Sequence, residues 1–255
     1  KNYKTRLDFK SRYKKLKQKV EKQGKSGKST QQGIKKSETQ TILLGFPNTG
    51  KSSLFKSLTN QDSKISPHPY STTEPILGSS QYEDAKIQIV DTPSFPNTEQ
   101  SIIHNADTIL LVIDDIEQIK DSEKYLKKTR AKIITIFNKS DLLNEKEKRK
   151  ISETLKSKKQ DFVLFSSKTK ENIDELKKKI FETFPIIRIY TKEPKKPATK
   201  DPMILKKDST TKQVAEKILK GFSERVTRIK IWGPSSKFSG QVVGLEHILK
   251  DKDTI

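Results

Sequence analysis

Short apolar runs alternate with amphipathic stretches through the middle of the chain. The continuous runs predict strands of the kind that a parallel sheet buries on both faces, at 41–45, 86–90, 109–113, 132–137 and 162–165. Apolar residues at helical spacing predict helices at 53–59 and 172–184. This alternation is typical of an α/β domain in which helices cover both faces of a mostly parallel sheet.

The pattern changes toward both ends of the chain. Near the N-terminus, a thin apolar stripe among lysines predicts a basic amphipathic helix (Leu7, Phe9, Tyr13, Leu16, Val20), and residues 23–33 have the composition of a linker. After Pro185, two predicted strands at 186–191 and 229–232 accompany a predicted helix at 210–219, which indicates a small α+β domain of the β-grasp type.

These changes divide the chain into three parts. We expect a basic helical arm and linker at 1–36, an α/β domain at 37–185 and a β-grasp domain at 186–255. Of the 255 residues, 53 are Lys or Arg and 32 are Asp or Glu, so the formal net charge is +21. By part, the net charge is +12, +1 and +8. A nearly neutral middle between two basic ends predicts that the middle carries the chemistry while the ends bind a polyanion.

Composition also excludes several kinds of site. The chain has no cysteine, which excludes disulfides and thiolate metal sites. No apolar run approaches the roughly 18 residues of a membrane span, so we expect a cytoplasmic protein without a membrane partner. We also expect it to be a monomer. An anionic lipid surface is the weaker choice of polyanion, because the basic arm has few large apolar residues. Residue 1 is Lys rather than Met, so the sequence leaves open what precedes it.

A phosphate-binding motif follows the first predicted strand. Residues 45–52 read GFPNTGKS, which matches G-x-x-x-x-G-K-[ST], and a predicted helix follows as a P-loop requires. In such a loop, backbone N–H groups surround the phosphates, Lys51 reaches the β- and γ-phosphates, and the Ser52 hydroxyl binds Mg²⁺. The predicted nucleotide-binding residues here are Gly45, Phe46, Pro47, Asn48, Thr49, Gly50, Lys51, Ser52 and Ser53.

Polar residues also follow three later strands. Asp91 directly follows the strand at 86–90, where a carboxylate is needed next to the groups that bind Mg²⁺. Ser94 comes three residues later. The last two strands are followed by polar groups that are predicted to bind the nucleotide (Asn138, Lys139, Asp141; Ser166, Ser167, Lys168). Ligands bind at the carboxyl ends of strands in an open α/β sheet, so these groups are expected to meet at one site.

In this order and spacing, the motifs resemble those of the translation-factor-related GTPases. The resemblance implies a P-loop NTPase G domain. It also implies that Asp141 accepts two hydrogen bonds from guanine. Because adenine has no such pair of donors, Asp141 would select GTP over ATP. By the same resemblance, Asn138 ties its loop to the P-loop, Lys139 lies on the base, and the Ser167 backbone meets guanine O6.

The loop at 70–78 (YSTTEPILG) is similar to switch I of the Obg and DRG (developmentally regulated GTP-binding protein) branch. The spacing to Pro75 and Gly78 places Thr72, rather than Thr73, at that branch's Mg²⁺-binding threonine. Ser52, Thr72 and Asp91 are thus the implied metal residues, and Lys51, Thr72 and Asn48 the implied catalytic ones.

The C-terminal segments closely resemble the TGS domain of DRG proteins (188–192, 205–210, 232–233, 243–247, 251–253). That resemblance implies a ubiquitin-like fold and contact with RNA or the ribosome. The domain that DRG proteins insert after the DxxG motif has no room here, because only residues 95–105 separate Ser94 from the next strand region. A compact DRG-like protein is therefore expected.

Two departures from the family bear on catalysis. Ser94 replaces a glycine whose N–H contacts the γ-phosphate, and Phe95 stands where Ras-like proteins carry the glutamine that orients water. Phe95 cannot polarise water, so either hydrolysis is slow or the missing charge comes from elsewhere, such as a protein activator. Asn48 suggests K⁺ as another source, because GTPases with Asn at this position resemble the potassium-activated group. The alternative is an Asn that only caps the turn.

Together these features predict a Mg²⁺-dependent protein that hydrolyses GTP to GDP and phosphate as a switch on the ribosome or RNA. The alternative is a constitutive RNA-binding protein in which GTP is structural and turnover is negligible.

Overall fold

The computed structural model describes residues 39–59, 74–127, 129–193 and 196–255. The predicted basic arm and Thr72 lie outside these ranges. Within them, no helix combines the length and the apolar character needed to cross a membrane.

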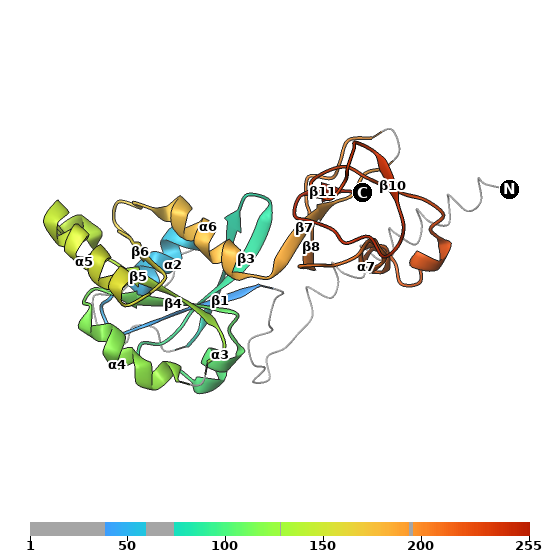
Figure 1. Ribbon diagram of the computed structural model, residues 1–255. Helices are drawn as coiled ribbons and strands as arrows, with labels where there is room; N and C mark the ends of the chain where they lie inside the picture. The colour runs from blue at the N-terminus through green and yellow to red at the C-terminus, as the bar shows by residue number, and fades with distance from the viewer. Residues whose placement is uncertain (1–38, 60–73, 128, 194–195) are drawn as a thin grey trace. The chain divides into compact units, whose positions relative to one another are not determined.

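Six strands form the sheet of the first domain, in the order β2-β3-β1-β4-β5-β6 (Figure 1). All neighbouring strands are parallel except β2, which runs antiparallel to β3. Both faces of β1 and β4 are buried, which explains the continuous apolar runs ILL in β1 and ILLVI in β4. The strands are β1 (Gln40–Gly45), β2 (Ile76–Tyr82), β3 (Ala85–Asp91), β4 (Thr108–Ile113), β5 (Lys132–Phe137) and β6 (Phe162–Leu164).

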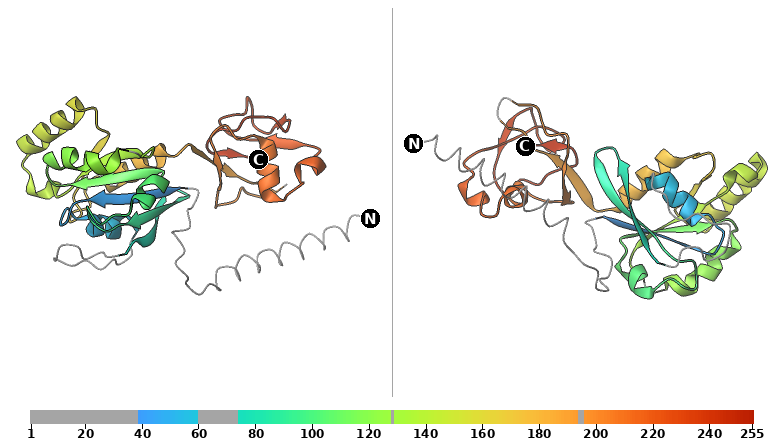
Figure 2. Two further views of the ribbon diagram at one scale, coloured as in Figure 1. Left: turned by 90° about the horizontal axis from the view of Figure 1, so that it is seen from below. Right: turned by 180° about the vertical axis from the view of Figure 1, so that it is seen from behind.

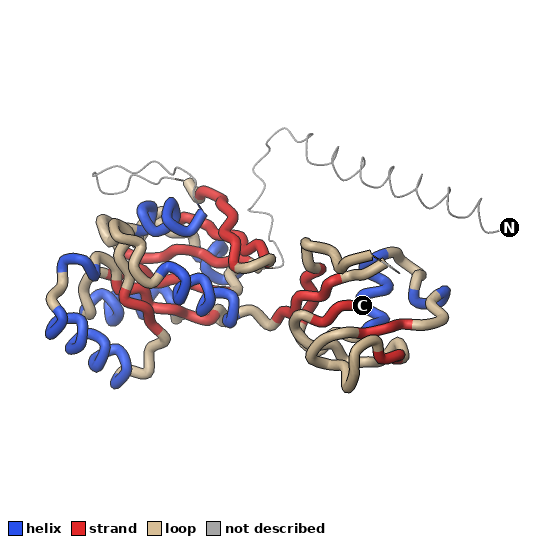
Figure 3. Tube along the Cα trace, turned by 90° about the horizontal axis from the view of Figure 1, so that it is seen from above, coloured by secondary structure: helices blue, strands red, loops and turns tan. Residues whose placement is uncertain are grey.

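Helices lie on both sides of this sheet (Figure 3). Figure 1 shows α2 and α6 on one side and α3 and α4 on the other. Leu54, Phe55 and Ile180 are among the side chains through which α2 and α6 pack on the sheet in one buried apolar cluster. The helices are α2 (Lys51–Thr59), α3 (Gln100–Asn105), α4 (Glu117–Leu126), α5 (Glu145–Ser157) and α6 (Ile173–Thr183), with a 3₁₀ turn η1 (Ser140–Leu142).

The topology places the P-loop at a crevice. From β1 the chain passes through α2 to β2 and β3 on one side of β1, and it then crosses to β4 on the other side. The strand order therefore reverses at β1, and ligands of open α/β sheets bind at such a point, beyond the carboxyl ends of the strands.

Strand β2 corrects the sequence analysis. Residues 76–78 were expected in the switch loop, but they pair with β3, with Ile76 opposite Asp91 and Gly78 opposite Ile89. A Cβ atom on Gly78 would lie 2.6 Å from Phe55 Cζ and 2.7 Å from Thr59 Cγ2. Gly78 thus lets helix α2 pack closely against the sheet.

Helices α4 and α5 were not predicted. Only Ile151 and Leu155 are buried on α5, so its apolar stripe is short and most of its face is charged. The helix begins instead with a capping box, in which the Asn144 side chain accepts from the Glu147 N–H and the Glu147 carboxylate accepts from the Asn144 N–H.

The C-terminal part contains short strands around one helix (Figure 2). A three-stranded sheet has the order β11-β7-β8, and β9 pairs antiparallel with β10. Trp232, next to β9, bridges to Thr254 of β11 and so joins the two sheets. The elements are β7 (Ile186–Tyr190), β8 (Met203–Lys206), α7 (Thr211–Ile218), η2 (Ser223–Arg225), β9 (Ile229–Ile231), β10 (Gln241–Val243) and β11 (Asp253–Thr254).

Arg188 is buried on β7 and pairs with Asp251. Its Nε and Nη2 atoms donate to the two carboxylate oxygens at 3.1 and 2.6 Å, and its backbone N–H donates to Oδ1 at 2.7 Å. Burial by itself would raise the pKa of Asp251, but the hydrogen bonds from Arg188 together with the charges of Arg188 and Lys252 hold this pKa below its usual value.

Candidate functional site

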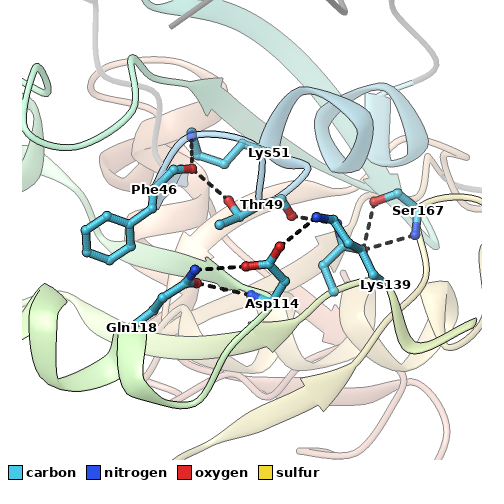
Figure 4. Close-up of polar contacts among 8 residues, drawn as sticks. Phe46, Thr49, Lys51, Asp114, Gln118, Lys139 and Ser167 are labelled. Atoms are coloured by element: carbon cyan, nitrogen blue, oxygen red, sulfur yellow. Dashed lines mark hydrogen bonds and ion pairs between the residues drawn. The ribbon is translucent and has the colours of Figure 1, made fainter. Parts of the chain in front are cut away.

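The P-loop forms between β1 and α2 as the motif requires, and α2 begins at Lys51 itself. The Lys51 side chain is buried and curls back over the loop, where Nζ donates to the Phe46 carbonyl at 3.0 Å and to the Gly45 carbonyl at 3.2 Å (Figure 4). Burial lowers the pKa of Lys51 to about 8, and the charge of Asp91 opposes this shift. The ammonium group is thus held at the N-terminus of α2, where a phosphate is favoured.

Both motif glycines are required by the structure. A Cβ atom on Gly45 would lie 2.3 Å from the Val112 carbonyl oxygen, and one on Gly50 would lie 2.2 Å from Asn138 Nδ2. Gly50 also has φ +87°. Asn48 is exposed with φ 63°, a conformation that Asn tolerates better than most residues, so the backbone alone gives a reason for Asn here.

Ser52 and Asp91 form the part of the site that fits Mg²⁺. Ser52 Oγ donates to Asp91 Oδ2 at 2.8 Å. Asp91 is fully buried, and its Oδ1 has no hydrogen-bond partner in the described part of the chain. Burial raises the pKa of this carboxyl, and the hydrogen bond from Ser52 and the charge of Lys51 oppose the rise. A buried carboxylate oxygen left open beside a hydroxyl suits a hard cation that takes oxygen ligands.

Asn138 ties three loops together. This residue is buried after β5, and its Nδ2 donates to the Thr49 carbonyl of the P-loop at 2.8 Å. Its Oδ1 accepts from the Ser167 N–H at 3.1 Å and from Ser167 Oγ at 3.0 Å. The loops after β1, β5 and β6 are thereby fixed to one another, as the resemblance implied for Asn138.

Asp141 lies next to this junction and is only partly buried. Its Oδ1 accepts from Ser166 Oγ at 2.6 Å, and this hydrogen bond is the main reason that the pKa of Asp141 is lowered. Ser166 Oγ in turn accepts from the N–H of Lys168 at 3.3 Å. Asp141 is therefore an oriented, ionised carboxylate at neutral pH.

The segment after β3 lies against the P-loop. Ser94 Oγ is 2.6 Å from Lys51 Nζ, and the Phe95 N–H donates to the Gly45 carbonyl at 3.0 Å. The Phe95 ring is buried, stacks on Tyr125 at 4.2 Å between centroids, and meets Phe46 edge-on at 5.4 Å. Phe95 thus has a packing role in a three-ring cluster that the sequence analysis did not anticipate.

Asp114 and Gln118 were also missed. Asp114 follows β4 directly and pairs with Lys139, with 2.6 Å between Oδ2 and Nζ, and Gln118 holds Asp114 (Figure 4). The sequence contained a signal for Asp114, because this residue directly follows β4 as Asn138 directly follows β5.

Comparison with known proteins agrees with this geometry. Residues 40–139 match the family described as 50S ribosome-binding GTPase, and residues 187–255 match the TGS domain. The chain therefore has a G domain of the P-loop GTPase type followed by a C-terminal TGS domain. The matched G-domain residues include the P-loop, Asp91 and Asn138, whereas Asp141 and Ser166 lie beyond the match.

Two relatives align with most of the chain. An uncharacterized GTP-binding protein of Methanocaldococcus jannaschii is 27% identical over 332 residues, covering 97% of this chain and 85% of the relative. GTP-binding protein 1 of Schizosaccharomyces pombe is 23% identical over 311 residues, covering 87% and 83%. These relatives are consistent with the DRG/Obg-like class. Both alignments are longer than this chain, so the relatives carry segments without a counterpart here, which fits a compact form.

Among solved structures, an Era variant from Aquifex aeolicus bound to GDP and AlF₄⁻ is similar, with a TM-score of 0.52 and 25% identity. The match covers 75% of this chain and 70% of the Era chain. The G-domain fold is therefore that of Era-like GTPases.

Proposed function

We propose that this GTPase hydrolyses GTP to GDP and phosphate with Mg²⁺ and acts as a molecular switch on the ribosome or another RNA. The observation that carries the proposal is the pair of Ser52 and Asp91, where a buried carboxylate with an open oxygen adjoins the hydroxyl at the start of the P-loop helix. A Mg²⁺–triphosphate complex would satisfy this buried oxygen, whereas leaving it without a partner costs free energy.

Each side chain has a separate task. Lys51 would bind the β- and γ-phosphates, Ser52 and Thr72 would be ligands of Mg²⁺, and the Asp91 carboxylate would help to hold the ion. When bound, Mg²⁺ neutralises phosphate charge. Asp141 selects guanine, because guanine offers two adjacent N–H donors to a carboxylate and adenine does not.

Intrinsic turnover should be slow, because the buried Phe95 ring cannot orient a water molecule. We propose that a protein activator, or K⁺ held with the help of Asn48, supplies the missing charge stabilisation. Ser94 keeps a backbone N–H for the γ-phosphate, since that N–H is independent of the side chain.

The partner is proposed from charge and from the family. Residues 186–255 carry a net charge of +8 and residues 1–36 a net charge of +12, and the matched family is described as ribosome-binding. When a basic surface binds a nucleic acid, cations condensed on the phosphate backbone are released, and this release favours binding. We therefore assign RNA binding to an arm at 1–36 and a TGS domain at 186–255, with the G domain at 37–185 as the switch, in a cytoplasmic monomer.

A second function is favoured by one observation. The Phe95 ring is locked between Phe46 and Tyr125, which suits a protein whose nucleotide is structural and whose RNA binding is constitutive. RNA affinity that is equal in the GTP and GDP states would favour this second function, and affinity that differs between them would favour the switch.

Phosphate release from GTP and from ATP, with and without ribosomes in potassium buffer, tests the proposal. We expect the wild type to hydrolyse GTP but not ATP, and ribosomes to stimulate this turnover. The Asp141→Asn variant should show no turnover with GTP. Tight GTP binding without turnover in every condition would contradict the switch and leave the structural nucleotide.

A further inference from the structure

Lys139 is held at both ends of its side chain. Its backbone is in the left-handed conformation, with φ 62° and ψ 31°, at the start of η1. Its Nζ atom lies 2.6 Å from Asp114 Oδ2. The side chains of Lys139 and Asp114 are 40% and 26% exposed, so the pair is neither fully buried nor free in solvent. The aliphatic stem of Lys139 therefore spans a fixed path between β5 and the end of β4.

Gln118 fixes the acidic partner. Gln118 Nε2 donates to Asp114 Oδ1 at 2.8 Å, and the Asp114 N–H donates to Gln118 Oε1 at 3.2 Å. These two hydrogen bonds join the residue after β4 to the first turn of α4. Asp114 Oδ1 is thus occupied by Gln118 while Oδ2 remains directed at Lys139 (Figure 4).

Holding the Lys139 side chain in one conformation lowers the conformational entropy that is lost when a nucleotide binds. A lysine side chain has many rotamers, and ordering it under a ligand loses conformational entropy. When the rotamer is already set, that loss has occurred before the ligand arrives, and affinity rises without a new contact to the ligand.

We propose that Asp114, held by Gln118, is a positioning residue that presets Lys139 beneath the guanine base and so strengthens binding of GTP and GDP alike. This inference rests on the proposed function, because it requires the base to lie on Lys139. Asp114 acts through Lys139 and touches no reacting atom. The competing account is a purely structural ion pair that joins β4 to β5.

The test is Asp114→Asn, which removes the charge while keeping the size and an oxygen for Gln118. We expect the Kd of fluorescently labelled GDP and of a labelled non-hydrolysable GTP analogue to rise by the same factor, about two- to fivefold. At saturating GTP, kcat should be unchanged and KM raised. The matched control is Asp115→Asn, because Asp115 is exposed and its Oδ1 accepts from the Glu117 N–H, as an Asn oxygen also can.

A double-mutant cycle with Lys139→Met separates positioning from structural support. If Asp114 acts through Lys139, Asp114→Asn has no further effect on Kd in the Lys139→Met background. An unchanged Kd in the single variant, or a loss that persists in the Lys139→Met background, would overturn the inference and leave the proposed function intact. A wild-type protein that binds neither GTP nor GDP would overturn both.

Discussion

The ammonium group of Lys51 and the hydroxyl of Ser94 lie 2.6 Å apart, in hydrogen-bond contact between the P-loop and the segment after β3. In the family that the motifs resemble, glycine occupies the position of Ser94 and offers no such contact. The side chain that should bind phosphate is therefore held by three protein oxygens, those of Gly45, Phe46 and Ser94. Binding of nucleotide has to compete with them.

Replacing Ser94 by Ala should tighten GDP binding. The variant removes one competitor for Lys51 and keeps the backbone N–H, so we expect about a two- to tenfold lower Kd, the equivalent of one net hydrogen bond. Isothermal titration with GDP measures it, and Ser94→Gly should reproduce the gain. Weaker GDP binding in Ser94→Ala would instead assign the hydroxyl a direct contact with phosphate.

Replacing Asp141 by Asn should exchange guanine for xanthine as the preferred base. Xanthine carries a carbonyl oxygen where guanine has its exocyclic amine, and an Asn amide can donate to that oxygen. We expect GTP affinity to fall at least about a hundredfold, because the variant loses charge-assisted hydrogen bonds, and XTP binding to appear. Competition between GTP and XTP for a labelled nucleotide shows the exchange, and retained GTP selectivity would contradict the role of Asp141.

Hydrolysis of GTP should be faster in potassium chloride than in sodium chloride at equal ionic strength if Asn48 helps to hold a monovalent cation. Asn48→Gly is the informative variant, because Gly adopts the positive φ of this position without the side chain. Loss of the potassium advantage with GTP binding retained would support the cation role. Equal rates in both salts for the wild type would leave Asn48 as a turn residue.

Replacing Gly78 by Ala should destabilise the G domain. The added methyl group would meet Phe55 and Thr59 at less than 3 Å, so helix α2 has to move away from β2. We expect a loss of about 1–3 kcal/mol in the free energy of unfolding. The matched control is Gly244→Ala, because a Cβ atom there meets nothing within 4 Å. Urea denaturation of both variants provides the comparison, and equal stabilities would contradict the close packing.

Replacing Asp251 by Asn should destabilise the TGS domain at neutral pH by about 1–3 kcal/mol, since the carboxylate accepts two side-chain hydrogen bonds from the buried Arg188. The pKa of Asp251 is lowered in the folded protein, so its stabilisation is complete above the pKa of the unfolded chain. It is lost as the pH falls through the lower folded value.

The difference in the free energy of unfolding between wild type and Asp251→Asn should therefore shrink as the pH is lowered from about 5 toward 2. Urea denaturation at successive pH values gives this difference. A difference that is constant over this range would show that the charge of Asp251 makes no contribution.

Elements that local sequence dictates were predicted well. The P-loop needs a strand, a glycine turn and a helix that are consecutive in the chain, and the structure has them within two residues of the predicted bounds. The strands β4 and β5 were predicted from apolar runs, since β4 is buried on both faces throughout and β5 from Ile134 to Phe137. Strand β2 was missed because residues 76–82 (ILGSSQY) contain glycine and serines, and pairing with β3 rather than propensity makes it a strand.

The sequence by itself determined the motifs, the order of the parts and the fold of the G domain, because those depend on residue type and spacing along the chain. Only the tertiary structure decided that Ser94 meets Lys51, that Asp114 meets Lys139 and that Asn138 joins its own loop to the P-loop and to the loop after β6. These partners are 25 or more positions apart. Strand order and register bring them within hydrogen-bond distance, and a local pattern of residues encodes neither.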